Sequence, residues 1–200
     1  YTYDQKTGGI LLNSSPSGFS KEPRPVYAAE LDILGFDNYW RYDKQTDLPY
    51  MWAEANTYWY RGVCVAKLKG GNLYSAPEII IPTDENGTKV TPELNGNALR
   101  PIDVPAMIAA NHVMLQIIEQ TTVKKILAVY EKYKGKLDLF HVAFSGGKDS
   151  AVLLDLVKKA LHKGSFVVVF GDTGMEFPDT YDVVDKTKKL CEQEEIPFYI

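Results

Sequence analysis

The stretch 137-LDLFHVAFSGGKDSAVLLDLV-157 dictates the architecture of the second half of this chain. An apolar run that ends at Phe144 predicts a β-strand, and the apolar residues after Ser150 recur at helical spacing. Gly146 and Gly147 lie between the two. Paired glycines permit a sharp turn in which successive backbone amides point at one ligand. The sequence therefore predicts a strand, an anion-binding loop and a helix.

The loop holds the groups that a polyphosphate or phosphosulfate requires. Lys148 supplies a positive charge, and the first helical turn adds unpaired N–H groups and the positive end of the helix dipole. A Walker-type P-loop needs glycine in place of Val142 and serine or threonine in place of Asp149, so this loop is of another kind. An ordinary strand-to-helix turn, the other alternative, needs neither a second glycine nor a lysine. We predict phosphate binding by Ser145, Gly146, Gly147, Lys148, Asp149 and Ser150, with Lys148 and Asp149 acting electrostatically in catalysis.

Composition narrows the class of protein. The net charge is −4, with 10 basic and 12 acidic residues in 1–100 and 12 and 14 in 101–200. This even balance gives no indication of nucleic-acid binding, although a local patch can hide in such averages. No run is long enough to cross a bilayer, and only Cys64 and Cys191 are cysteines. We expect a cytoplasmic protein without disulfides. The sequence does not determine its oligomeric state.

The first half differs in kind, because 14 of the 24 aromatic residues lie in residues 1–100. We predict a small β-rich N-terminal domain there. Residues 1–24 are expected to form a loosely structured arm, and 26–33, 51–55 and 73–81 are candidate strands. The segments 57–60 and 63–68, joined by Arg61-Gly62, predict a β-hairpin. Residues 82–101 are rich in turn-forming residues.

A helical connector is predicted over 101–136, with Thr121 or Thr122 capping a second helical segment. Strands at 137–144, 165–170 and 196–200 then alternate with helices at 150–163 and 179–194. This pattern predicts an α/β fold, a parallel, doubly wound, Rossmann-like sheet truncated at about three strands. We expect residues 137–200 to be the first half of a nucleotide-binding domain that continues past Ile200.

A second motif, 171-GDTGMEFPDTY-181, follows the second strand of this sheet. Ligands of open α/β sheets bind at the carboxyl ends of strands, so both loops are expected to face one crevice. Asp172 and Thr173 offer an acceptor and a donor toward a ligand or Mg²⁺, and Gly174 permits an unusual backbone conformation. Phe177 and Pro178 can wall a planar group such as adenine. Alternatively, Asp179 or Thr180 caps the next helix and Phe177 packs in the core.

The remaining reactive or aromatic residues are expected to be structural. Cys191 shares a helix face with Val183, Val184 and Thr187, and Cys64 lies between two valines, so both are predicted to be packing residues. His112, His141 and His162 show no metal-ligand spacing. Tyr58-Trp59-Tyr60 can stack on nucleic-acid bases, but without a basic stripe we favour an aromatic platform that packs on the second domain.

SGGKDS together with DTGMEFPDTY resembles the phosphoadenosine phosphosulfate (PAPS) reductase family of the adenine nucleotide α-hydrolase-like (PP-loop) superfamily. The resemblance covers about residues 104–200, and the hairpin 57–71 is similar to longer members with an extra N-terminal domain. It implies a bound adenine nucleotide (PAPS, adenosine 5′-phosphosulfate (APS) or ATP). The residues that match the family's two ligand-side loops are Ser145, Gly146, Gly147, Lys148, Asp149 and Ser150, then Asp172, Thr173, Gly174, Phe177 and Pro178.

The resemblance implies reduction of PAPS or APS to sulfite with a thiol donor such as thioredoxin. The family's cysteine nucleophile, and in other members an iron–sulphur cluster or zinc, would lie beyond residue 200, so we expect this fragment alone to be inactive. Two alternatives stay open. One is an ATP pyrophosphatase that adenylates sulfate or a nucleic acid, and the other is a nucleotide-binding module without catalysis.

Overall fold

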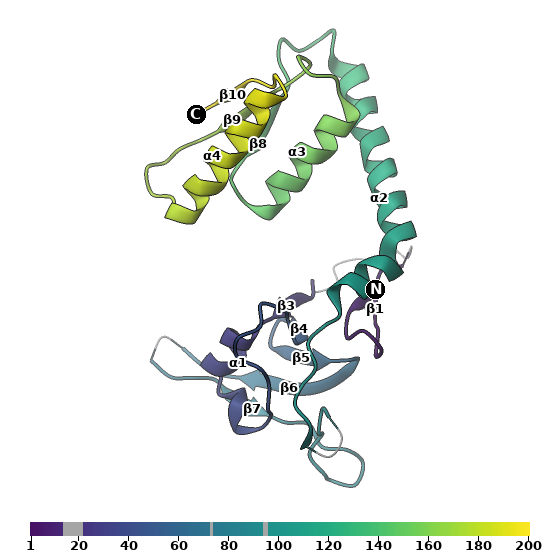
Figure 1. Cartoon of the computed structure of the whole chain (residues 1–200), viewed down its shortest axis with the longest axis vertical. Helices are drawn as coiled ribbons and strands as arrows, with labels where there is room; N and C mark the ends of the chain where they lie inside the picture. The colour runs from purple at the N-terminus through teal and green to yellow at the C-terminus, as the bar shows by residue number, and fades with distance from the viewer. Residues whose placement is uncertain (14–21, 73, 94–95) are drawn as a thin grey trace. The chain divides into compact units, whose positions relative to one another are not determined.

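The computed structural model describes residues 1–13, 22–72, 74–93 and 96–200. Its backbone packing divides the chain into two units, Tyr1–Met114 and Leu115–Ile200, which are considered separately. The first unit holds an antiparallel sheet and the second a three-stranded parallel sheet (Figure 1). The predicted mixed α/β class is confirmed at this level, and the parallel sheet is consistent with a Rossmann-like fold. The predicted division at residues 100 and 136 stays a prediction.

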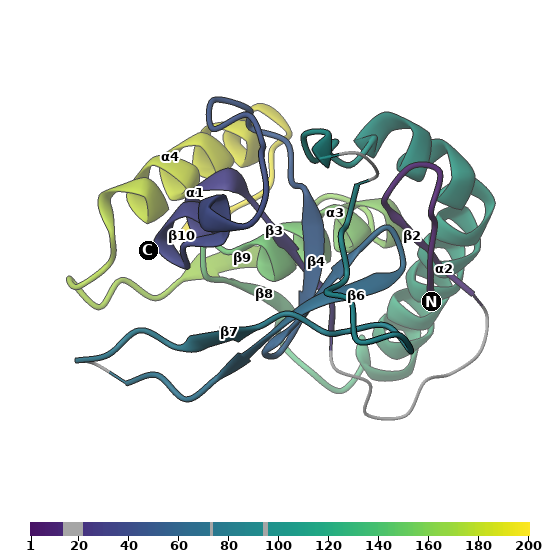
Figure 2. The same ribbon diagram turned by 90° about the horizontal axis from the view of Figure 1, so that it is seen from below.

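The sheet of the first unit has five strands in the order β3-β4-β5-β6-β7. Their bounds are Arg24–Val26, Met51–Glu54, Thr57–Tyr60, Val63–Lys69 and Glu78–Ile80. The predicted hairpin is confirmed as β5 and β6. Its turn residues Arg61 and Gly62 both have positive φ (48° and 85°), which matches the right-handed twist of the strands. Figure 2 shows β6 and β7 as neighbouring strands, which pair antiparallel.

The two faces of this sheet are covered differently. One face and helix α1 (Ala28–Ile33) enclose a core that contains Val26, Leu31, Phe36, Met51, Tyr58, Tyr60 and Val65. On the other face Trp52 donates through Nε1 to the carbonyl of Gly8 (3.0 Å), and Trp59 stacks on Tyr3 with ring centroids 5.4 Å apart. The short strands β1 (Thr2–Tyr3) and β2 (Ile10–Leu11) pair antiparallel there.

Three predictions for this unit need correction. Residues 1–24 are not simply a loose arm, because β1 and β2 pair and Trp52 binds the turn between them; residues 14–21 lie outside the described residues. The predicted strand 26–33 ends at Val26, since Ala28 and Leu31 are one helical turn apart and bury the same side of α1. Tyr58 and Tyr60 are each 1% exposed within this unit's own core, so they form no platform for another domain.

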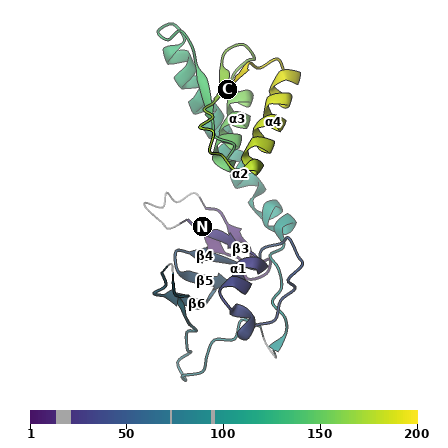
Figure 3. The same cartoon turned by 90° about the vertical axis from the view of Figure 1, so that its left-hand side faces the viewer.

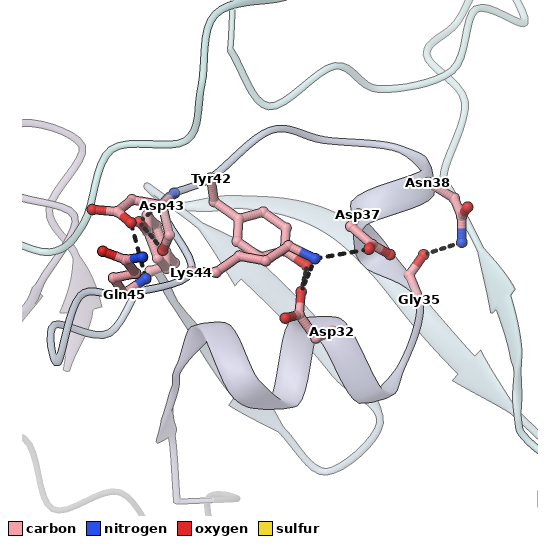
Figure 4. Close-up of polar contacts among 9 residues, drawn as sticks. Asp32, Gly35, Asp37, Asn38, Tyr42, Asp43, Lys44 and Gln45 are labelled. Atoms are coloured by element: carbon pink, nitrogen blue, oxygen red, sulfur yellow. Dashed lines mark hydrogen bonds and ion pairs between the residues drawn. The ribbon is translucent and has the colours of Figure 1, made fainter.

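Ion pairs and hydrogen bonds join the segment after α1 to the end of that helix (Figure 4). The 3-10 helix η1 (Phe36–Asn38) contributes Asp37, whose carboxylate lies 3.0 Å from the Lys44 ammonium. The same ammonium lies 2.9 Å from Asp32, which also accepts a hydrogen bond of 2.7 Å from the Tyr42 hydroxyl. The bond from Lys44 and then the bond from Tyr42 lower the pKa of Asp32.

We expect Lys44→Met to raise the pKa of Asp32 toward its ordinary value, because the main group that stabilises the carboxylate is lost. A carboxylate whose pKa is lowered by folding stabilises the folded state above its unfolded pKa, and this stabilisation disappears as the pH falls through the folded pKa. Acid titration followed by carboxyl ¹³C NMR measures the change. Lys69→Met, at an exposed lysine of β6, should leave the Asp32 titration unchanged; an equal change there would contradict the assignment.

Helix α2 runs without interruption over Val104–Tyr133, so the predicted cap at Thr121 or Thr122 is wrong. Thr122 instead donates its hydroxyl to the carbonyl of Ile118 (2.8 Å), as threonines inside helices do. Near the start of α2, Asn111 is buried and bridges to β2. Its Nδ2 donates to the carbonyls of Ile10 (2.7 Å) and Met107 (2.9 Å), and its Oδ1 accepts from the N–H of Leu12 (2.7 Å).

We expect Asn111→Ala to destabilise the first unit by about 2–3 kcal/mol, because the half-buried N–H of Leu12 and carbonyl of Ile10 lose the partner that Asn111 supplies. Chemical denaturation measures the loss, and hydrogen exchange at the Leu12 amide should accelerate with it. The exposed Asn86→Ala is the matched control. Unchanged protection of Leu12 in Asn111→Ala would contradict this role.

The second unit follows the predicted order of elements. Strands β8 (His141–Phe144), β9 (Val167–Phe170) and β10 (Phe198–Tyr199) alternate with helices α3 (Lys148–Ala160) and α4 (Pro178–Gln193). All strand pairs are parallel, in the order β10-β9-β8. Every predicted element is present, and most are shorter than expected at their ends. Helix α3 begins two residues earlier, inside the glycine loop.

Helices α3 and α4 lie side by side (Figures 1 and 3) and pack on one face of the sheet. The buried residues that they share with the strands include Val142, Phe144, Leu154, Val157, Val168, Phe170, Val184 and Cys191. Cys191 is 2% exposed, and burial raises the pKa of its thiol, so the predicted packing role is confirmed. On the opposite face of the sheet, Ala143 pairs in register with Val169 and is exposed.

No helix in the described part of the chain is both long and apolar enough to cross a membrane.

Candidate functional site

The glycine loop leaves β8 and enters α3 through two glycines of different conformation. Gly146 has a φ of +75°, in the left-handed region that favours glycine. Gly147 is extended (φ −84°, ψ 165°) and is the N-cap of α3, with no side-chain cap. The Ser150 hydroxyl bonds back to the carbonyl of Gly147 at 2.9 Å and receives the N–H of Ser145 at 3.2 Å. The serines therefore hold the loop in shape.

Several amides of this loop are available to a ligand. Within the described residues, the N–H groups of Gly146, Lys148, Asp149 and Ser150 have no hydrogen-bond acceptor, and the first bond into the helix is that of Ala151 to Gly147. The N–H of Gly147 makes only a long contact of 3.4 Å with the Ser145 hydroxyl. Unpaired amides at a helix N-terminus attract anions.

Charge at the loop is exposed and movable. The Lys148 ammonium lies 3.0 Å from Oδ1 of Asp149, and the two side chains are 87% and 91% exposed. A pair this exposed is weakly held, because water screens both charges. An anionic ligand can therefore draw the Lys148 ammonium away from Asp149 with little loss of free energy.

The loop after β9 turns around a single carboxylate. Oδ1 of Asp172 accepts hydrogen bonds from the N–H of Gly174 (2.8 Å) and from the Tyr181 hydroxyl (2.7 Å). These bonds, with that of Tyr181 the stronger influence, lower the pKa of Asp172. Gly174 has a φ of +72°, which confirms the predicted conformational need for glycine. Asp172 is thus held as an anion at the carboxyl end of β9.

The other predicted residues of this loop lie in different settings. Thr173 donates its hydroxyl to Oε1 of Glu176 at 3.0 Å. Phe177 is 79% exposed, so the alternative that it packs in the core is wrong. It is the N-cap of α4 without a side-chain cap, and Pro178 occupies the first turn, so capping by Asp179 or Thr180 is wrong too. An adenine-walling role for Phe177 and Pro178 stays a prediction.

The two loops touch at Gly146. A Cβ placed on this residue would lie 2.9 Å from Cγ2 of Thr180 and 3.6 Å from Cγ2 of Val184. Thr180 and Val184 belong to the first two turns of α4. The first loop is therefore in direct contact with the start of α4, and both loops contribute to one hollow, through Ser145 and through Gly171 and Glu176.

A hollow of about 310 Å³ extends from this edge. It begins at Ser145 and reaches along the face of the sheet that α3 and α4 leave uncovered, over Ala143 and Val169. The full lining is His141, Ala143, Phe144, Ser145, Val169, Phe170, Gly171 and Glu176.

We expect Gly146→Ala to destabilise the second unit by about 1–2 kcal/mol from the left-handed backbone alone, with a further cost from the contact with Thr180. Thermal or chemical unfolding measures the loss. Gly135→Ala, where the added methyl meets nothing within 4 Å, is the matched control. Equal stability of the two variants would contradict the described loop geometry.

Mg²⁺ at this edge would need ligands in addition to protein side chains. The described residues contain no group of three or more histidine, cysteine, aspartate or glutamate side chains that could hold a metal. Mg²⁺ commonly uses one or two carboxylates together with substrate phosphates and water. The second carboxylate oxygen of Asp172 and the side chain of Asp149 are the groups that suit such an ion here.

Sequence reasoning gave no role to Tyr181 or Glu176 and named Thr180 only as an alternative cap of the next helix. Tyr181 and Thr180 lie on the first turn of α4, which returns the chain toward the loop residues before it. The one available signal was the position of these residues at the start of a helix that directly follows a ligand-side loop. The contact between Thr180 and Gly146 joins segments 34 residues apart and has no signature in the sequence.

A parallel sheet with an open-amide glycine loop after its first strand is typical of nucleotide-binding α/β domains. Comparison with known families narrows this class. Residues 140–198 match the phosphoadenosine phosphosulfate reductase domain, which confirms the predicted resemblance for this segment and supports nucleotide binding.

Two similar proteins come from Methanocaldococcus jannaschii. Uncharacterized protein MJ0066 is 42% identical over 83 residues, which is 42% of this chain and 16% of that protein. Uncharacterized protein MJ0973 is 39% identical over 75 residues, or 38% of this chain and 18% of that protein. The chain thus spans less than a fifth of the length of either relative. No solved structure matches the chain.

Proposed function

We propose that residues 137–200 form the phosphate-binding half of an adenine-nucleotide site in an enzyme of PAPS reductase type. The observation that carries this proposal is the set of unpaired loop amides beside Lys148, at the edge where Asp172 and the hollow also lie. These amides would bind the phosphosulfate or polyphosphate group, and the hollow would receive the nucleoside. The match to the reductase domain supports this reading.

The reaction that we propose for the whole protein is reduction of a sulfonucleotide. A thiolate attacks the sulfonate sulfur and displaces the nucleoside phosphate; a second thiol then releases sulfite and leaves a disulfide. Lys148 and the loop amides would stabilise the negative charge on the departing phosphate. Cys64 and Cys191 are unsuited as the nucleophile, because burial raises the pKa of both thiols.

The second candidate is an ATP pyrophosphatase, in which a substrate attacks the α-phosphorus of ATP and pyrophosphate leaves. The same amides and Lys148 suit this transfer equally well, and the carboxylate of Asp172 suits an accompanying Mg²⁺. Sulfite release from APS or PAPS against pyrophosphate release from ATP, measured on the full-length protein, separates the two reactions.

Nucleotide binding itself can be tested on this chain. We expect Lys148→Ala to weaken binding of ATP and APS by about tenfold to hundredfold, since a charge-assisted contact contributes about 1.5–3 kcal/mol. Isothermal titration calorimetry measures the affinities. Lys186→Ala, at an exposed lysine of α4, is the control for the loss of one positive charge. Equal affinities for the wild type and Lys148→Ala would remove Lys148 from the site.

A further inference from the structure

The hollow beside the glycine loop has a polar and an apolar part. Its floor is formed by small or branched side chains of neighbouring strands, Ala143 and Val169, which are partners in the sheet register. Glu176 is its acidic wall. If the loop amides hold the anionic end of a nucleotide, the nucleoside lies over this floor and its ribose comes near the loop that carries Glu176.

Glu176 is held in place and keeps acceptor capacity. Its side chain is half-buried, and Oε1 already accepts the Thr173 hydroxyl at 3.0 Å. A carboxylate offers about four lone-pair positions on its two oxygens, so Oε2 remains available to hydroxyl donors. The 2′- and 3′-hydroxyl groups of an unmodified ribose are donors of this kind.

Positive charge is scarce around this wall. Lys148 is the one basic residue in the two ligand-side loops, 145–150 and 171–181, and it belongs to the phosphate-binding loop. Residues 115–200 contain no arginine. Asp172 adds a second carboxylate to the loop of Glu176. A second phosphate group placed at the ribose would meet the half-buried carboxylate of Glu176 in the hollow, where like charges repel more strongly than in bulk water.

From this arrangement we infer that Glu176 is a specificity-determining residue that favours a nucleotide with a free 3′-hydroxyl and disfavours one with a 3′-phosphate. The inference rests on the proposed nucleotide site and narrows its substrate class to APS or ATP rather than PAPS. The Glu176 carboxylate accepts hydrogen bonds from the ribose hydroxyls of APS or ATP. The same carboxylate repels the 3′-phosphate of PAPS.

APS and PAPS differ only in the 3′-phosphate, so their affinity ratio isolates this effect. We expect the wild-type chain to bind APS at least tenfold more tightly than PAPS in calorimetric titrations at fixed salt. Glu176→Gln keeps the shape and removes the charge, and should reduce the ratio at least threefold. Glu176→Lys should bring the ratio to one or invert it. Asp185→Asn, an equal change of charge on an exposed position of α4 outside the hollow, should preserve the ratio.

The outcomes are distinguishable. Failure of both compounds to bind would contradict the proposed nucleotide site, and the role of Glu176 would fall with it. Binding of both compounds with PAPS equal to or tighter than APS in the wild type would overturn the inference about Glu176 and leave the nucleotide site standing. An unchanged ratio in Glu176→Gln, with the variant folded by circular dichroism, would overturn it as well.

Discussion

The close approach of Gly146 to the first turn of α4 is the constraint on which the candidate site depends. A residue with a side chain at this position would meet Thr180, and its backbone would be strained at a φ of +75°. Glycine removes both obstacles, so the loop after β8 can lie against the helix that follows β9. The open amides of one loop and the fixed carboxylate of the other thereby come to the same edge of the parallel sheet.

Charge is distributed unevenly along that edge. The loop before α3 combines unpaired N–H groups with Lys148, whereas the loop before α4 presents Asp172 and Glu176. A ligand that satisfies both loops is anionic at one end and rich in hydroxyl donors at the other. An adenine nucleotide with an unmodified ribose meets this description, which joins the proposed function to the inferred specificity.

The first unit is held together by aromatic contacts and hydrogen bonds on both faces of its antiparallel sheet. Its sheet is covered on one face by α1 and on the other by the β1–β2 hairpin, which Trp52 and Trp59 fasten through a hydrogen bond and a ring stack. Asn111 connects the same region to the start of α2 through two hydrogen bonds, to Ile10 and Leu12. Tyr3, Trp52 and Trp59 are the aromatic residues engaged in these contacts. Tyr58 and Tyr60 lie in the core on the α1 side of the sheet, each 1% exposed, and offer no aromatic surface to another partner.

The sequence by itself determined the order of strands and helices in the second unit and the position of the glycine loop between β8 and α3, because periodicity and paired glycines act over a few neighbouring residues. It also determined the hairpin at Arg61-Gly62, whose turn requires positive φ. Only the tertiary structure decided that residues 28–33 are helical, that α2 continues past Thr122 and that Tyr181 holds Asp172. Residues 28–33 are helical because Ala28 and Leu31 bury one side of α1 in the core of the first unit. The hydroxyl of Thr122 bonds to Ile118 inside α2 and caps no new helix. The bond from Tyr181 to Asp172 forms because the first turn of α4 returns toward the preceding loop, and this return has no periodic signal in the sequence.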